Sequence, residues 1–201
     1  MQKVGTFSNS RGFTIVELLI VIVIIGILAS LVIAAYNGIQ DRANNQQTET
    51  AVAAYRKALI QYATDNRSYP ITGSACLNEA ALPNCWAWPI STSFNNAIRP
   101  YMGNTSTLPS LSPQQIITTA WGTRVGGSFF YNTVATLDGA LHPYYIGYNL
   151  KGTGACKLSG VLSHASGAWT NFSTTSPASS HTHSTTGASF CAVALPDPAT
   201  L

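Results

Sequence analysis

The sequence predicts an α+β fold in which one long N-terminal helix packs on a small antiparallel β-sheet, with a disulfide-stabilised C-terminal region. Three observations predict this fold. An uncharged apolar stretch, residues 18–35, continues into a segment with helical periodicity that ends near residue 66. Strand-like alternation follows in the last third of the chain, and all four cysteines lie beyond the helical segment.

Residues 13–35 are long enough to cross a bilayer. A helix of these 23 residues reaches roughly 34 Å, and a hydrocarbon core is about 30 Å thick. Lys3 and Arg11 precede the stretch, and positive charge favours the cytoplasmic side. We therefore expect a single-pass anchor in the plasma (inner) membrane, with residues 1–12 in the cytoplasm and the residues after the anchor exported.

Glu17 is the one acid inside this apolar stretch. A carboxylate at the centre of a membrane span costs on the order of 3 kcal/mol, and such residues usually have a partner and a function. No cation lies nearby within the span. From the residues alone, two interpretations stay open: Glu17 lies near the interface and reaches water or is protonated, or its partner comes from elsewhere.

The residues before and after Glu17 form a recognisable motif. Residues 11–36 closely resemble the type IV prepilin leader and N-terminal helix, beginning Arg11-Gly12-Phe13-Thr14-Ile15-Val16-Glu17. The resemblance implies that a prepilin peptidase cleaves between Gly12 and Phe13 and methylates the new amine of Phe13. It also implies a partner for Glu17, namely the amine of Phe13 on a neighbouring subunit. A buried ionic contact of this kind can specify the register between subunits.

The resemblance divides the chain into four parts. They are a cytoplasmic prepilin leader (residues 1–12), a transmembrane and assembly helix (13–35), an amphipathic continuation (36–66) and an exported globular pilin domain (67–201). Gly26 is a further assembly residue, because with Ser30 and Ala34 it forms a small-residue ridge that lets helices approach closely. Many pilins carry proline where Ala34 stands, so melting of the helix between Gly26 and Ala34 is left open.

The helix is predicted to run from Phe13 to about Thr64. Its amphipathic continuation is expected to turn one apolar stripe toward a sheet. Apolar residues recur at steps of three and four along it: Tyr36, Ile39, Ala43, Val52, Tyr55, Leu59 and Tyr62. The helix is expected to stop at residues 65–70, because Pro70 disfavours helical geometry at Tyr69. A similar turn ends the long helix of pilins and pseudopilins.

Weaker patterns follow beyond the helix. Residues 93–98 indicate a short helix ended by Pro100, and residues 112–117 indicate another. Strands are expected at residues 128–134, 144–150, 156–162 and 190–195, in an antiparallel sheet of about three to five strands that packs on the Val52 to Tyr62 face. Residues 163–187 are expected to form a long polar loop.

The four cysteines, all in the exported part, predict disulfides. Three connectivities are possible. Pairing of Cys76 with Cys85 and of Cys156 with Cys191 is favoured because it closes the shortest loops, and a late disulfide around a C-terminal loop resembles many pilins. The second bond would stabilise the fold by about 4 kcal/mol. A zinc site is disfavoured because no close Cys-x-x-Cys spacing occurs.

Composition and motifs argue against other functions. Without Lys3 and Arg11 the chain has 8 basic and 7 acidic side chains, so no specific nucleic acid binding is expected. No spaced acid pair, nucleophile elbow or phosphate-binding loop is found, and we expect neither enzymatic activity nor a cofactor. His181-Thr182-His183 lacks a nearby third ligand, so no metal site is expected there.

The sequence therefore predicts a structural subunit of a type IV pilus-like filament that serves adhesion, motility or DNA uptake. Its expected partners are other copies of itself and other pilin subunits, the prepilin peptidase, the pilus assembly platform and, before assembly, membrane lipid. Its final location would be an extracellular filament on the cell surface. Two alternatives stay open: a pseudopilin of a type II secretion system, and a membrane-tethered adhesin or binding module that does not polymerise.

Overall fold

The computed structural model describes residues 13–71, 73–78, 90–103, 107–109, 111, 117–119, 122–124, 127–136, 141–151, 156–160, 172–173, 181–183 and 188–201. The chain divides into two units, Met1–Gln40 and Asp41–Leu201. Helix α1, Ile15–Asn66, begins in the first unit and continues into the second.

Helix α1 has 52 residues and is unbroken at Gly26 and Ala34, which confirms the expected helix to about Thr64. It ends at Arg67, whose φ of 54° is left-handed and whose backbone N–H donates to the Ala63 carbonyl at 2.9 Å. This geometry is the left-handed cap that commonly terminates helices. Among the described residues, no helix combines the length and apolar character required of a membrane span.

The main sheet is antiparallel and, in the described part of the chain, has six strands in the order β1-β4-β5-β8-β7-β6. The expected maximum of five was wrong because three strands are too short to show alternation. The strands are β1 Ala75–Cys76, β4 Gly127–Thr136, β5 Leu141–Lys151, β6 Phe172–Ser173, β7 His181–His183 and β8 Ala188–Ala194. The expected strands near residues 128, 144 and 190 are confirmed as β4, β5 and β8.

The pairing of β4 with β5 contains an irregularity opposite a proline. The register shifts between Tyr131 and Ala135 of β4, which pair with Tyr144 and His142 of β5. Pro143 lies between those two β5 residues and has no N–H to donate to the ladder, so the strand pairing is interrupted there.

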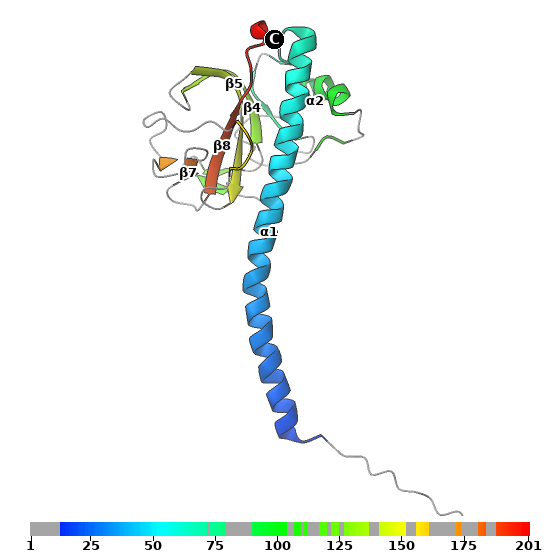
Figure 1. Cartoon of the computed structure of the whole chain (residues 1–201), viewed down its shortest axis with the longest axis vertical. Coiled ribbons are helices and arrows are strands. Elements are labelled where there is room, and N and C mark those ends of the chain that lie inside the picture. The colour runs from blue at the N-terminus through cyan, green and yellow to red at the C-terminus, as the bar shows by residue number, and fades with distance from the viewer. Residues whose placement is uncertain are drawn as a thin grey trace, which may run out of the picture. The chain divides into compact units, whose positions relative to one another are not determined.

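Within the second unit, the sheet packs on α1, as Figure 1 shows for β4, β5 and β8. The helix contributes Val52, Tyr55 and Leu59, which are fully buried. The sheet side of the core includes Phe129, Ile146, Tyr148, Leu150 and Val193. Burying each such side chain stabilises the fold by about 1.5–3 kcal/mol. The expected packing of the Val52 to Tyr62 face is thereby confirmed at its centre.

The segment before β4 contains two short helices and a two-stranded sheet. Helix α2, Thr92–Ile98, begins where the Ser91 hydroxyl accepts the N–H of Phe94, and the Phe94 ring stacks on Phe129 at 5.5 Å. The short helix expected at residues 93–98 is confirmed as α2, which ends at Ile98. Pro100 lies in the first turn of the 3-10 helix that follows, η1, Arg99–Met102, where proline is tolerated. Strands β2, Ile117–Thr119, and β3, Gly122–Arg124, pair with each other. Of the helix expected at residues 112–117, residues 112–116 lie outside the described residues, and Ile117 is in strand β2.

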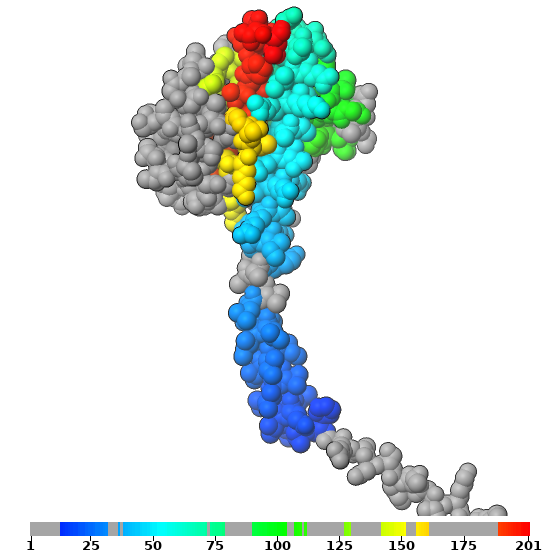
Figure 2. Space-filling model, viewed as in Figure 1, coloured from blue at the N-terminus to red at the C-terminus, as the bar shows by residue number. Residues whose placement is uncertain are grey.

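Two expectations about the amphipathic continuation and its partner segment were wrong. Tyr36 and Ile39 are 61% and 64% exposed, and Ala43 is exposed as well, so the buried stripe does not include these three residues. Cys156 to Gly160 form a turn instead of the strand expected there. Gly160 has a left-handed φ of 80°, and a Cβ at that position would lie 3.1 Å from Nη2 of Arg56. Side chains of α1 contact this segment, which Figure 2 shows in yellow against the helix.

Candidate assembly site at the start of the long helix

Thr14 and Glu17 form a reciprocal cap at the start of α1. Because α1 begins at Ile15, Thr14 is the N-cap and Glu17 the third helical residue. The Thr14 backbone N–H and hydroxyl both donate to Oε2 of Glu17, at 2.9 and 2.8 Å, and the Glu17 N–H donates to the Thr14 hydroxyl at 3.2 Å. This is a capping box, which satisfies backbone donors that the first turn leaves open.

The capping box was missed in the sequence, although its signal is present. The pattern Thr-x-x-Glu before an apolar run is its signature, and residues 14–17 fit it. A search for a neighbouring cation does not find this partner, because the donors are the hydroxyl and the backbone N–H of Thr14. Glu17 therefore has a partner on its own chain, in addition to any that a second subunit supplies.

The geometry leaves Glu17 able to accept a further donor. Both bonds from Thr14 use Oε2, and in the described part of the chain no bond to Oε1 is found. Phe13, whose amine is the expected new terminus, is adjacent and 87% exposed. An ammonium from another subunit could approach Oε1 without displacing the capping box.

The helix surface next to this cap is apolar and uncovered. Large side chains between Ile15 and Leu31 are 48–84% exposed. The Ser30 hydroxyl donates to the Ile27 carbonyl at 2.7 Å, so this polar group is satisfied within the helix. Nothing lies within 4 Å of a Cβ built at Gly26, so nothing in the described part of the chain requires glycine there. A contiguous apolar surface of this kind marks a site that binds lipid or protein.

The N-terminal segment also matches a known family. Residues 7–33 match the family described as the prokaryotic N-terminal methylation motif. The matched segment carries the prepilin-type N-terminal motif. This prepilin-type N-terminus includes Gly12, which lies outside the described residues, together with Phe13, Glu17 and Gly26.

The chain is also similar to curated proteins over part of its length. It is 45% identical over 64 residues to the type II secretion system core protein G of Klebsiella michiganensis, covering 32% of this chain and 45% of the relative. It is 41% identical over 90 residues to the protein of that name from Escherichia coli K12, covering 43% and 59%. The chain thus spans about half the length of the curated relatives it matches. No solved structure matches the chain.

The expected disulfides are partly within the described residues. Cys156 and Cys191 are bonded, with their Cα atoms 5.8 Å apart, which confirms that pairing. Cys76 is disulfide-bonded, and its expected partner Cys85 lies outside the described residues. The two histidines expected not to bind metal, His181 and His183, lie at the ends of β7.

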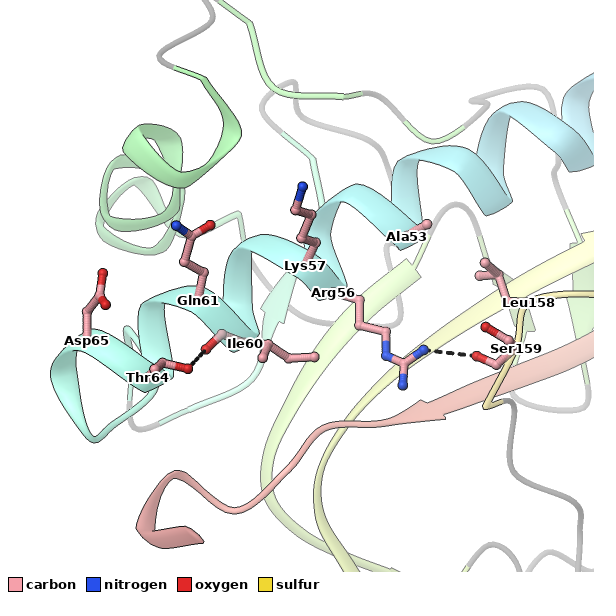
Figure 3. A pocket seen from close by; sticks show the side chains of 9 residues that line it. All are labelled: Ala53, Arg56, Lys57, Ile60, Gln61, Thr64, Asp65, Leu158 and Ser159. Carbon is pink, nitrogen blue, oxygen red and sulfur yellow. Dashed lines mark hydrogen bonds between the residues drawn. The ribbon is translucent and has the colours of Figure 1, made fainter. Parts of the chain in front are cut away.

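A second feature is a groove of about 560 Å³ along one side of α1 in the second unit (Figure 3). The Arg56 guanidinium lies at this groove and donates to the Ser159 carbonyl at 2.9 Å. The groove is lined by Ala53, Arg56, Lys57, Ile60, Gln61, Thr64, Asp65, Leu158 and Ser159.

Proposed function

We propose that the chain is a structural, non-enzymatic subunit of a type IV pilin-like filament. The observation that carries this proposal is the prepilin-type N-terminus on a continuous helix with exposed apolar side chains from Ile15 to Leu31. Such a surface fits lipid before assembly and neighbouring helices afterwards, at little cost because both are apolar. A head-to-tail contact that does not close into a ring produces a filament.

In this proposal, residues 13–35 hold the precursor in the inner membrane, and a prepilin peptidase removes residues 1–12. The new amine of Phe13 is methylated and pairs with Glu17 of a neighbouring subunit. The open Oε1 of Glu17 supports this pairing, because the carboxylate can keep its bonds to Thr14 while it accepts the amine. Assembly also requires an assembly platform in the membrane, and the residues after the anchor form the exported pilin-like domain.

A second candidate is a pseudopilin of a type II secretion system. It is favoured by the relatives, which are named type II secretion system core protein G. The two candidates differ in cellular role, since a pilus would extend from the surface for adhesion, motility or DNA uptake. Deleting the gene separates them: loss of surface filaments supports the pilus, and loss of secreted enzymes with no change in filaments supports the pseudopilin.

Substitutions at Glu17 test assembly itself. Glu17→Gln keeps an oxygen that accepts from Thr14 but removes the charge, whereas Glu17→Ala removes both. We expect both variants to be processed and inserted in the membrane, with filament yield reduced at least about tenfold, because the ionic partner of the Phe13 amine is lost. Electron microscopy gives the yield, and mass spectrometry of the N-terminal peptide checks cleavage and methylation.

The controls decide between assembly and tethering. Ser30→Ala, in the same helix, should assemble normally because its hydroxyl is bonded only within its own turn. Abundant filaments from Glu17→Ala would contradict the ionic contact. A wild-type chain that is processed but never polymerises would favour the membrane-tethered binding module.

A further inference from the structure

Three polar side chains of α1 lie on one side of the helix, at four-residue spacing, where the second unit begins. They are Asp41, Asn45 and Glu49. Each is bonded to a residue more than 100 positions away: Asp41 and Asn45 to Lys151, and Glu49 to Lys157. These bonds connect the helix to the end of β5 and to the turn after it.

Asn45 makes the most specific of these contacts. Its Nδ2 donates to the Lys151 carbonyl at 2.8 Å, and its Oδ1 accepts the Lys151 backbone N–H at 3.0 Å. A side-chain amide carries one acceptor and donors, as a peptide group does. Asn45 therefore bonds to Lys151 in the way that a residue of an adjacent strand would.

The end of β5 needs such a partner because it extends past the strand beside it. In the described register, β4 begins at Gly127 opposite Tyr148, whereas β5 continues to Lys151. On its other side, β5 stays paired with β8 as far as Lys151, which lies opposite Ala188. Among the described residues, no other partner than Asn45 is found for the backbone groups of Lys151 that β8 does not use, and an open strand edge is unfavourable.

The neighbouring ion pair adds little by itself. The Lys151 ammonium lies 3.0 Å from the Asp41 carboxylate, but the two side chains are 61% and 35% exposed. Exposed ion pairs contribute little to stability. At the end of β5, the two bonds between Asn45 and the Lys151 backbone are therefore the stronger polar connection, and the ion pair with Asp41 adds little to them.

The position of this contact along α1 gives it a role in assembly. N-terminal to Asp41, the described side chains at Tyr36, Ile39 and Gln40 are exposed. Among the described side chains, Asp41 and Asn45 are therefore the first on α1 that bond to the sheet domain.

We propose that Asn45 is a positioning residue that stands in for a strand at the end of β5 and fixes the sheet domain to one level of α1. This inference rests on the proposed filament function and deepens it. Every subunit would then hold its sheet domain in one arrangement on the part of α1 that belongs to the second unit, so that the sheet domains of assembled subunits are ordered alike.

Amide exchange in the mature full-length protein in detergent tests the contact directly. In Asn45→Ala we expect the Lys151 amide to exchange about tenfold faster, because its acceptor is gone. Asn45→Asp keeps an oxygen acceptor and should retain most of the protection of that amide. Gln46→Ala removes an exposed amide from the next position on the helix, so it is the matched control and should leave Lys151 unchanged. Unchanged exchange in Asn45→Ala would overturn the proposal.

Cryo-electron microscopy of filaments tests the positioning role. In Asn45→Ala filaments we expect well-resolved core helices and blurred sheet domains, while Gln46→Ala filaments stay ordered throughout. A loss of stability alone would lower the yield without blurring the domains. Equally ordered domains in Asn45→Ala filaments would overturn the role. If the wild type forms no filaments, the proposed function fails, and the exchange result still reports separately on the contact.

Discussion

At the scale of single residues, Thr14 changes how Glu17 is understood. The carboxylate that lacks a neighbouring cation in the sequence accepts two hydrogen bonds from Thr14, so the isolated chain already satisfies one of its oxygens. A capping threonine is typically worth about 1 kcal/mol of helix stability. The same hydroxyl orients Glu17, which leaves Oε1 open in the first turn of α1.

Thr14→Ala should loosen the start of α1 and lower assembly. Loss of the hydroxyl removes one donor to Glu17 and the acceptor for the Glu17 N–H, whereas Thr14→Ser keeps both. We expect amide exchange at residues 15–17 of the mature protein to accelerate about fivefold in Thr14→Ala. Thr14→Ser should match the wild type. Equal exchange in all three proteins would show that the capping box is not formed in solution.

At the scale of elements, close approach of β4 and β5 places a strict requirement on one glycine. A Cβ at Gly127 would lie 2.9 Å from the Gly147 carbonyl oxygen and 2.9 Å from Cβ of Tyr148. Both are fixed parts of the neighbouring strand, so neither can move without disturbing the sheet. The Gly127 carbonyl also accepts the N–H of Leu77 at 2.9 Å, next to β1.

Gly127→Ala should therefore destabilise the domain, by about 1–3 kcal/mol, as overpacking does. Gly73→Ala is the matched control, because nothing lies within 4 Å of a Cβ there. Its effect should stay within about 0.5 kcal/mol. Urea denaturation of both purified variants with disulfides intact measures the difference. A Gly127→Ala protein as stable as Gly73→Ala would mean that the strands separate easily at this point.

At the scale of the whole molecule, several tyrosines lie buried in the second unit. Tyr145 and Tyr148 are almost fully buried, and burial raises the pKa of both phenols well above the usual value of about 10. The nearby Glu49 carboxylate raises the pKa of Tyr148 further. Burial also raises the pKa of Tyr69, whose hydroxyl donates to the Pro196 carbonyl at 2.8 Å.

These shifts predict loss of stability in alkali. The phenols stay protonated in the folded domain but ionise near pH 10 when it unfolds, so their contribution is complete below about pH 10 and is lost as pH rises above it. The free energy of unfolding should fall above pH 10 by up to about 1.4 kcal/mol per pH unit for each phenol. Denaturant titrations between pH 7 and 11 measure this slope.

Tyr148→Phe provides the control for the alkaline slope. Among the described residues, the Tyr148 hydroxyl has no hydrogen-bond partner, so its removal should cost little at pH 7. The variant should lose stability less steeply above pH 10 than the wild type. An unchanged slope would show that Tyr148 is not among the groups that resist ionisation.

The elements that the sequence predicted correctly are those whose formation depends on residues close together along the chain. The helix from residue 15 to 66 and its end near Pro70 follow from periodicity and turn residues, and the strands around Phe129, Tyr145 and Val193 follow from alternation. The strand expected at Cys156 was wrong because a left-handed glycine and contacts with α1 make that segment a turn. The sequence likewise cannot show that Ile39 is exposed and lies outside the buried part of the apolar stripe.

The sequence by itself determined the prepilin-type N-terminus and the long helix with its acid at position 17, because these depend on neighbours along the chain or on a compact motif. It favoured the Cys156–Cys191 pairing among three connectivities, and the structure confirms that pairing. Only the tertiary structure decided the strand order, the close approach at Gly127 and the contact of Asn45 with Lys151. The physical reason is distance along the chain. A hydrogen bond between residues 106 positions apart leaves no periodic pattern, and it exists only because the folded sheet brings the open end of β5 to the helix.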